Sequence, residues 1–134
     1  MPIKSAAFAA AIVNHVTGRT VLTPPAQVSI ALLTALPADN ASAPTELVGT
    51  GYARATLAND STTWGTDSTD GTIRNSIDVP FGIAGGAWSG IVGWAMYNTA
   101  TGALLYYGPL QAAVSAATGE EVSFQPGALI VTEQ

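Results

Sequence analysis

The sequence contains no cysteine and a single histidine, so it has few residues suited to metal or acid–base chemistry. Without cysteine the chain cannot form disulfides, thiolate metal sites or a thiol nucleophile. His15 is the only conventional general base for neutral pH, and its place near the end of a predicted helix is explained by the attraction of a cation to a helix C-terminus. We therefore predict no catalytic residue, no metal, no cofactor, and a protein that is not an enzyme.

Charged residues are also scarce, at 10% of the chain against roughly 25% in an average soluble protein. Four basic and nine acidic residues give a net charge of −5, so the chain lacks the basic surface that attracts nucleic acids and anionic membranes. The apolar stretch at residues 6–13 is too short to span a bilayer. We expect neither a nucleic acid nor a membrane as partner. A surface this poor in charge is either neutral and polar or covered by other chains, and the second option predicts an oligomer.

A length of 134 residues predicts one domain, 1–134, made of an N-terminal helix at 4–17 and a β-domain at 26–134. The helix is predicted because Phe8, Ile12 and Val16 recur at intervals of four. Ser5 suits the N-cap, and Gly18 suits the residue that ends the helix.

The rest of the chain reads as short strands separated by turn signals, without the strand–helix alternation of a parallel sheet. Asn75 is the one polar residue on the inner face of the strand predicted between Ile73 and Phe81. Residues 37–50 and 59–71 have the composition of polar loops. We predict a mainly β fold, an antiparallel β-sandwich or small barrel of about seven strands with one N-terminal α-helix. The predicted strands lie at residues 28–36, 52–57, 73–81, 91–97, 103–108, 122–124 and 128–132.

Trp64 and Trp88 each lie beside glycine and small polar residues in predicted loops. An exposed indole there could stack on a sugar ring or insert into a pocket of a neighbouring subunit. Packing at the edge of the core is the alternative explanation for both residues.

Several segments, in this order, resemble a family of small virion proteins of tailed bacteriophages, variously labelled tail fibre protein, minor structural protein or capsid decoration protein. The resemblance covers most of the chain. It is carried by N-H-V-T-G at 14–18, V-S-I-A-L-L-T-A-L-P at 28–37, Glu46 with G-T-G-Y-A-R at 49–54, W-S-G-I-V-G-W-A-M-Y-N-T-A-T-G-A-L-L-Y-Y-G-P-L at 88–110 and V-S-F-Q-P-G-A-L at 122–129.

The resemblance implies a non-enzymatic structural protein of the virion. Because the chain has no sequence repeat from which to build a fibre shaft, we favour a capsid decoration (cement) protein that binds the capsid exterior and stabilises the head. Its partners would be the major capsid protein and further copies of itself in a small symmetric oligomer such as a trimer. The alternatives are a tail fibre, baseplate or other tail-associated protein and, third, a glycan-binding module.

The candidate interface residues come from the N-terminal helix and from the two loop tryptophans. Free terminal elements can reach neighbouring subunits without disturbing the fold. We therefore predict interface roles for Phe8, Ile12, Trp64 and Trp88.

Overall fold

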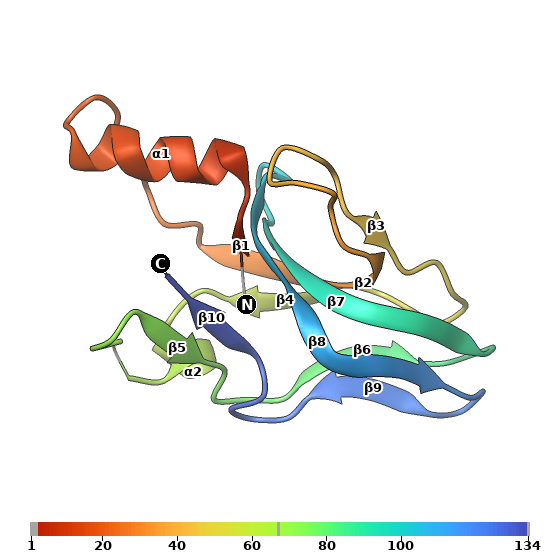
Figure 1. The fold of residues 1–134 in the computed structure, drawn as a ribbon. Helices are drawn as coiled ribbons and strands as arrows, with labels where there is room; N and C mark the ends of the chain where they lie inside the picture. The colour runs from red at the N-terminus through yellow and green to blue at the C-terminus, as the bar shows by residue number, and fades with distance from the viewer. Residues whose placement is uncertain (1–2, 67, 134) are drawn as a thin grey trace.

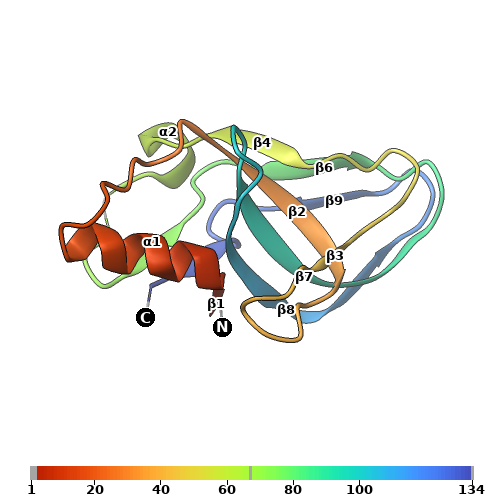
Figure 2. The same ribbon diagram turned by 90° about the horizontal axis from the view of Figure 1, so that it is seen from above.

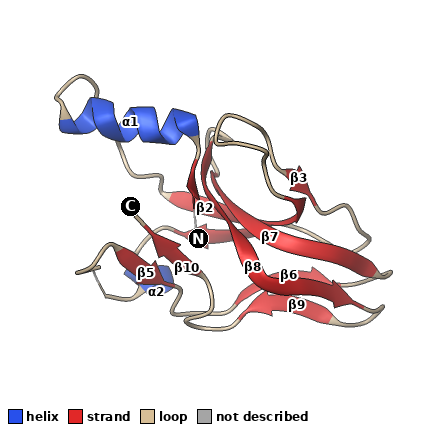
Figure 3. Cartoon of the chain, in the orientation of Figure 1, coloured by secondary structure: helices blue, strands red, loops and turns tan. Residues whose placement is uncertain are grey.

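The computed structural model describes residues 3–66 and 68–133, so residues 1, 2, 67 and 134 of the predicted domain lie outside the described part. Helices are few and strands dominate (Figure 3). The described residues form two helices and ten strands: β1 (Ile3–Lys4), α1 (Ala6–Val16), β2 (Gln27–Ala35), β3 (Thr45–Glu46), β4 (Ala55–Ala58), α2 (Ser61–Trp64), β5 (Thr72–Arg74), β6 (Val79–Ile83), β7 (Trp88–Asn98), β8 (Leu104–Ala116), β9 (Glu121–Phe124) and β10 (Ile130–Thr132).

The predicted N-terminal helix is confirmed as α1. Its first turn is capped by Ser5, whose Oγ accepts a hydrogen bond from the backbone N–H of Phe8 at 3.2 Å. At the other end Thr17 is the C-cap, and Gly18 follows with a φ of 74°, the left-handed conformation that ends many helices. α1 lies at one end of the sheet rather than across it (Figure 1). In the described part of the chain no helix is long and apolar enough to cross a membrane.

The larger layer is a six-stranded antiparallel sheet built around β2. Its order is β1-β8-β7-β2-β3, and β4 also pairs with β2. The strands predicted at 91–97 and 103–108 are present within β7 and β8, which form a hairpin and pair along most of their length. The free side of β2 is divided between β4, opposite Gln27–Ile30, and β3, opposite Leu33 and Ala35.

The second layer consists of two separate two-stranded ribbons, β5 with β10 and β6 with β9. The ribbons pack against one face of the large sheet, as the two perpendicular views show (Figures 1 and 2). The predicted antiparallel sandwich is therefore confirmed, and the alternative of a closed barrel is not. The core between the layers contains buried side chains from both: Val28, Ile30, Leu32, Val79, Phe81, Trp88, Ile91, Trp94, Met96, Leu129 and Val131.

The single strand predicted between Ile73 and Phe81 is wrong. The chain forms β5, bends at residues 75–78, and then forms β6 in the other ribbon. Asn75 causes the break, because its side chain is 2% exposed and bonds to the backbone of other segments. Its Nδ2 donates to the carbonyls of Ile77 at 2.8 Å and Gln125 at 3.0 Å, and its Oδ1 accepts from the N–H of Leu129 at 2.9 Å.

Two segments predicted as loops contain short regular elements. Residues 59–71 include α2, which Asp60 caps by accepting a hydrogen bond from Thr62 N at 2.9 Å. Residues 37–50 include the two residues of β3. Both elements are too short to produce a periodic pattern in the sequence.

The N-terminal and C-terminal ends of the described chain lie side by side (Figures 1 and 2). Lys4 in β1 forms an ion pair with Glu133, which follows β10. The hydroxyl of Tyr106 donates to the other carboxylate oxygen of Glu133 at 2.6 Å. These contacts tie the edge strand β1, the strand β8 and the end of the second layer together.

The Asn75 contacts predict that the two ribbons lose their relative position when this amide is removed. We expect Asn75→Ala to lower the free energy of unfolding by about 3 kcal/mol, because it removes the bond that the Leu129 N–H donates and the bonds that the Ile77 and Gln125 carbonyls accept from this amide. Asn98→Ala, which removes a bond to Ala100 N in an exposed turn, should cost less than about 1 kcal/mol. Urea unfolding measures both, and equal small losses would contradict the assigned role of Asn75.

Candidate functional site

Phe8 and Ile12, two of the predicted interface residues, are half-buried on α1. Phe8 packs against Tyr106 of β8 with ring centroids 5.2 Å apart and the planes at 73°. Phe8 therefore holds α1 to its own sheet. The large apolar side chains of the helix that are exposed are instead Val13, at 59%, and Val16, at 76%.

Trp64 lies at the end of α2 and is half-buried. Its indole Nε1 donates to Oδ1 of Asn59 at 2.8 Å, and Asn59 in turn donates from Nδ2 to the carbonyl of Pro25 at 2.8 Å. The indole N–H is therefore occupied within the chain, and the ring surface is the part of Trp64 that an outside molecule can contact.

Trp88 is a correction to the predicted interface. It is the first residue of β7 and is only 1% exposed, so it belongs to the core. Its Nε1 donates to the carbonyl of Thr50 at 3.0 Å, and its ring meets Tyr52 edge-on at 5.9 Å. The glycines just before Trp88 in the sequence do mark a turn, but β7 begins at Trp88 itself. Gly49, which is distant in the sequence, makes room for the indole. A Cβ on Gly49 would lie 2.6 Å from Cδ1 of Trp88.

An apolar cavity of about 350 Å³ lies where α1 and the segment after it meet the open end of the sandwich. It brings together two of the predicted residues, Phe8 and Trp64, whereas Ile12 and Trp88 do not line it. The other lining residues come from both layers and from the connection between α1 and β2: Leu22, Pro24, Pro25, Val28, Asn59, Ile73, Met96, Leu105, Tyr106 and Val131.

A second, polar cavity of about 270 Å³ lies on the other side of Trp64. Asp70 and Arg74 line it together with the hydroxyls of Thr66 and Thr72. Arg74 also donates to the carbonyl of Gly127 at 3.2 Å, and Asp70 accepts from Thr72 N at 3.0 Å. An indole beside a carboxylate, a guanidinium and hydroxyls is a combination that can contact a sugar.

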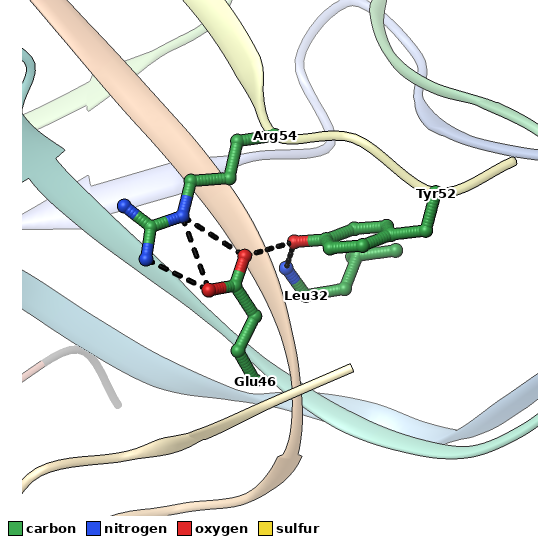
Figure 4. A network of polar contacts seen from close by, with 4 residues as sticks. All are labelled: Leu32, Glu46, Tyr52 and Arg54. Atoms are coloured by element: carbon green, nitrogen blue, oxygen red, sulfur yellow. Dashed lines mark hydrogen bonds and ion pairs between the residues drawn. The ribbon is translucent and has the colours of Figure 1, made fainter. Parts of the chain in front are cut away.

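The most connected polar cluster consists of Glu46, Tyr52 and Arg54, which the resemblance singled out as part of one motif (Figure 4). Arg54 holds both carboxylate oxygens of Glu46, with Nη2 at 2.7 Å from Oε1 and Nε at 2.9 Å from Oε2. The Tyr52 hydroxyl donates to Oε2 at 2.6 Å and accepts from the N–H of Leu32 at 3.1 Å. Leu32 lies between the part of β2 that pairs with β4 and the part that pairs with β3, so neither strand is paired with it. Its N–H therefore needs another acceptor, which is the Tyr52 hydroxyl.

The cluster favours the ionised form of Glu46. Burial alone would raise the pKa of this carboxyl, but the hydrogen bonds from Arg54 and Tyr52 outweigh it, and the pKa lies below its ordinary value. Burial, and then the bond to Glu46, raises the pKa of Tyr52. The guanidinium of Arg54 also lies 4.1 Å from the centre of the Tyr97 ring, a cation–π contact. Each polar group of the cluster thus has a partner within the chain, which indicates a structural role.

The glycines of the same motif are explained by close approach. Gly51 has a φ of 86°, and a Cβ at this position would collide with the carbonyl oxygen of Ile83. Together with the contact of Gly49 with Trp88, this lets the segment before β4 pass directly over the ribbon strand β6 and the start of β7. The motif therefore positions a loop against both layers.

His15 lies near the end of α1, as predicted. Its Nδ1 accepts a hydrogen bond from the N–H of Leu22 at 3.0 Å. This bond folds residues 17–22 back along the helix and so shapes the rim of the apolar cavity, a role that sequence reasoning missed because the two residues are seven positions apart.

The lowered pKa of Glu46 predicts an acid-sensitive contribution to stability. Ionised Glu46 stabilises the fold above its ordinary pKa of 4.5, and this contribution is lost as the pH falls through the lowered pKa of the folded state. We expect Glu46→Gln to cost about 1–2 kcal/mol at pH 7 and the difference from wild type to shrink below pH 4.5. Thermal unfolding from pH 7 to pH 3 measures this, with Glu121→Gln, an exposed carboxylate, as control. A difference that does not depend on pH would contradict the prediction.

Comparison with known protein families matches residues 4–132 to the family described as Podophage GP4 fiber I protein gp80. The match extends from β1 to the last residue of β10 and so includes α1 and both layers. No curated protein matches the chain. The predicted resemblance to a family of phage virion proteins is confirmed. The chain belongs to the family of the Podophage GP4 fiber I protein gp80 and is a structural protein of a phage virion.

Proposed function

We propose that this protein is a non-enzymatic component of a podophage tail fibre. The observation that carries the proposal is the family match over residues 4–132, because the family is described as a fibre protein. The polar cluster of Glu46, Tyr52 and Arg54 supports a structural role, since its groups bond to one another and to the backbone.

The capsid decoration hypothesis, with the major capsid protein as partner, has less support. It was favoured because the sequence lacks the repeat of a fibre shaft. A compact two-layer domain is excluded only as the shaft itself, and it can still form another part of a fibre. The family description favours the tail alternative over the capsid.

A tail component has to keep its shape outside the cell, and this chain does so without disulfides. The long strands β7 and β8 run through the centre of the larger sheet, and the core packs against them. The bonds of Asn75 fix the two ribbons to each other. The result is a domain whose second layer is held together by buried hydrogen bonds and packs on the larger sheet through apolar contacts.

The polar cavity beside Trp64 favours a second candidate function, contact with a host-surface glycan. The cavity combines the ring surface of Trp64 with the charged side chains of Asp70 and Arg74. Trp88 has no part in it, because its indole is buried in the core.

Gold-labelled antibodies against the purified chain test the tail assignment on intact virions. We expect the label on the tail, with antibodies against the major capsid protein as the control for labelling of the head. Label confined to the capsid exterior would overturn the fibre proposal and support a decoration protein.

A panel of bacterial surface polysaccharides tests the glycan candidate. We expect the affinity to fall at least about tenfold, or about 1.4 kcal/mol, in Trp64→Ala and in Arg74→Ala. Arg74→Ala is the safer variant for the fold because Arg74 is exposed. Arg19→Ala, which removes an exposed cation beyond α1, is the control. A wild-type chain that binds no polysaccharide, or variants that bind equally well, would reject this function.

A further inference from the structure

α1 has an unusual composition for a helix on the surface of a domain. Nine of its eleven residues are apolar, and the other two, Asn14 and His15, are not Lys, Arg, Asp or Glu. A surface helix normally has a charged or polar outer face, and a helix that is apolar all round is normally buried. No side chain of α1 is buried within this chain.

The apolar surface of α1 continues beyond the helix. Val13 is 59% exposed and Val16 is 76% exposed, and Val21, in the segment that His15 holds back along the helix, is 79% exposed. Most of the surface of each of these side chains stays in water, and this exposed apolar surface costs free energy.

An apolar cavity lies next to this apolar projection. The cavity of about 350 Å³ is lined by Phe8 of α1 and by Leu22 and Pro24 of the following segment. The exposed valines of α1 and the apolar cavity therefore lie in one region of the chain. A second copy has the same two features, so its cavity can receive the valines of the first copy and its valines can enter the first copy's cavity.

The exposed surface is larger than that of a compact monomer. The chain exposes 7277 Å², whereas a compact monomer of its mass is expected to expose roughly 6,600 Å². An excess of this kind agrees with a helix that projects from the domain and is not covered by its own chain.

We propose that α1 is a self-association surface, on which Val13 and Val16 of one copy pack against α1 and the cavity rim of a second copy. Charge supports a copy of the same chain as the occupant, because contact between two uncharged helices buries no ionised group. A basic or acidic partner would find no opposite charge on α1 to bind. The inference goes beyond the fibre proposal and does not depend on where in the virion the chain lies.

Substitution of the projecting valines tests the surface. Val13→Lys/Val16→Lys keeps the helix, because lysine is a better helix former than valine and suits a helix C-terminus. Val48→Lys is the control: Val48 is 95% exposed and lies between β3 and β4. By analytical ultracentrifugation over a dilution series we expect wild type and Val48→Lys to associate alike, and the double variant to associate at least about tenfold more weakly. The same data give the number of copies, for which a trimer is the prediction from sequence.

A monomeric wild type at every concentration, or equal association of the double variant, would overturn the inference. Circular dichroism and thermal unfolding of all variants show that loss of association does not result from unfolding. The two proposals are tested by separate experiments. If the purified chain is monomeric but the antibodies label the tail, the self-association surface is refuted and the fibre proposal is not affected.

An introduced thiol locates the contact independently. The chain has no cysteine, so a disulfide in Val16→Cys can form only between two copies. We expect rapid formation of a covalent dimer on mild oxidation of Val16→Cys and slow formation for Val48→Cys, which is similarly accessible. Equal rates for the two variants would show that α1 is not the contact.

Discussion

The apolar inner face of the six-stranded sheet has to be covered, and two short ribbons cover it because Asn75 holds them in place. Each ribbon has only two strands, too few to be stable alone. The Asn75 side chain lies where the chain leaves β5 for β6, and it binds backbone groups on both sides of the segment that joins β9 to β10. One buried amide thus couples the two ribbons, and the ribbons together complete the core.

The elements with strong local signals could be predicted from the sequence. α1 has a capping serine and a terminal glycine, β2 ends before a proline, and the β7–β8 hairpin has two apolar runs around a polar turn. The break after β5 could not be predicted from alternation alone, because it depends on partners about fifty residues away. Asn75 was nevertheless visible as a polar residue on an apolar face, and that exception was the available signal. α2 and β3 were missed because a few residues give no period.

The site was predicted less well than the fold. Phe8 and Trp64 lie together at the apolar cavity, but Trp88 is in the core, where Gly49 accommodates its ring. The glycines next to Trp88 mark a turn, and nothing in the local sequence shows that the indole itself turns into the core beside a glycine from another segment. The outward position of Val13 and Val16 depends on which face of α1 the sheet occupies, so the structure was needed to identify the exposed side. The prediction of a capsid protein rested on the missing sequence repeat. That absence excludes a fibre shaft but does not exclude other parts of a tail fibre.

The contact between copies that we propose would explain three features together: the scarcity of charge, the exposed apolar surface of α1 and the adjacent cavity. Electron cryo-microscopy of the intact virion, at a resolution that traces the chain, tests this account most directly. The account predicts the two-layer domain in the tail, with α1 buried against α1 of a neighbouring copy. Density for the domain with α1 surrounded by solvent would contradict contact between copies, and density on the capsid exterior would contradict the tail assignment.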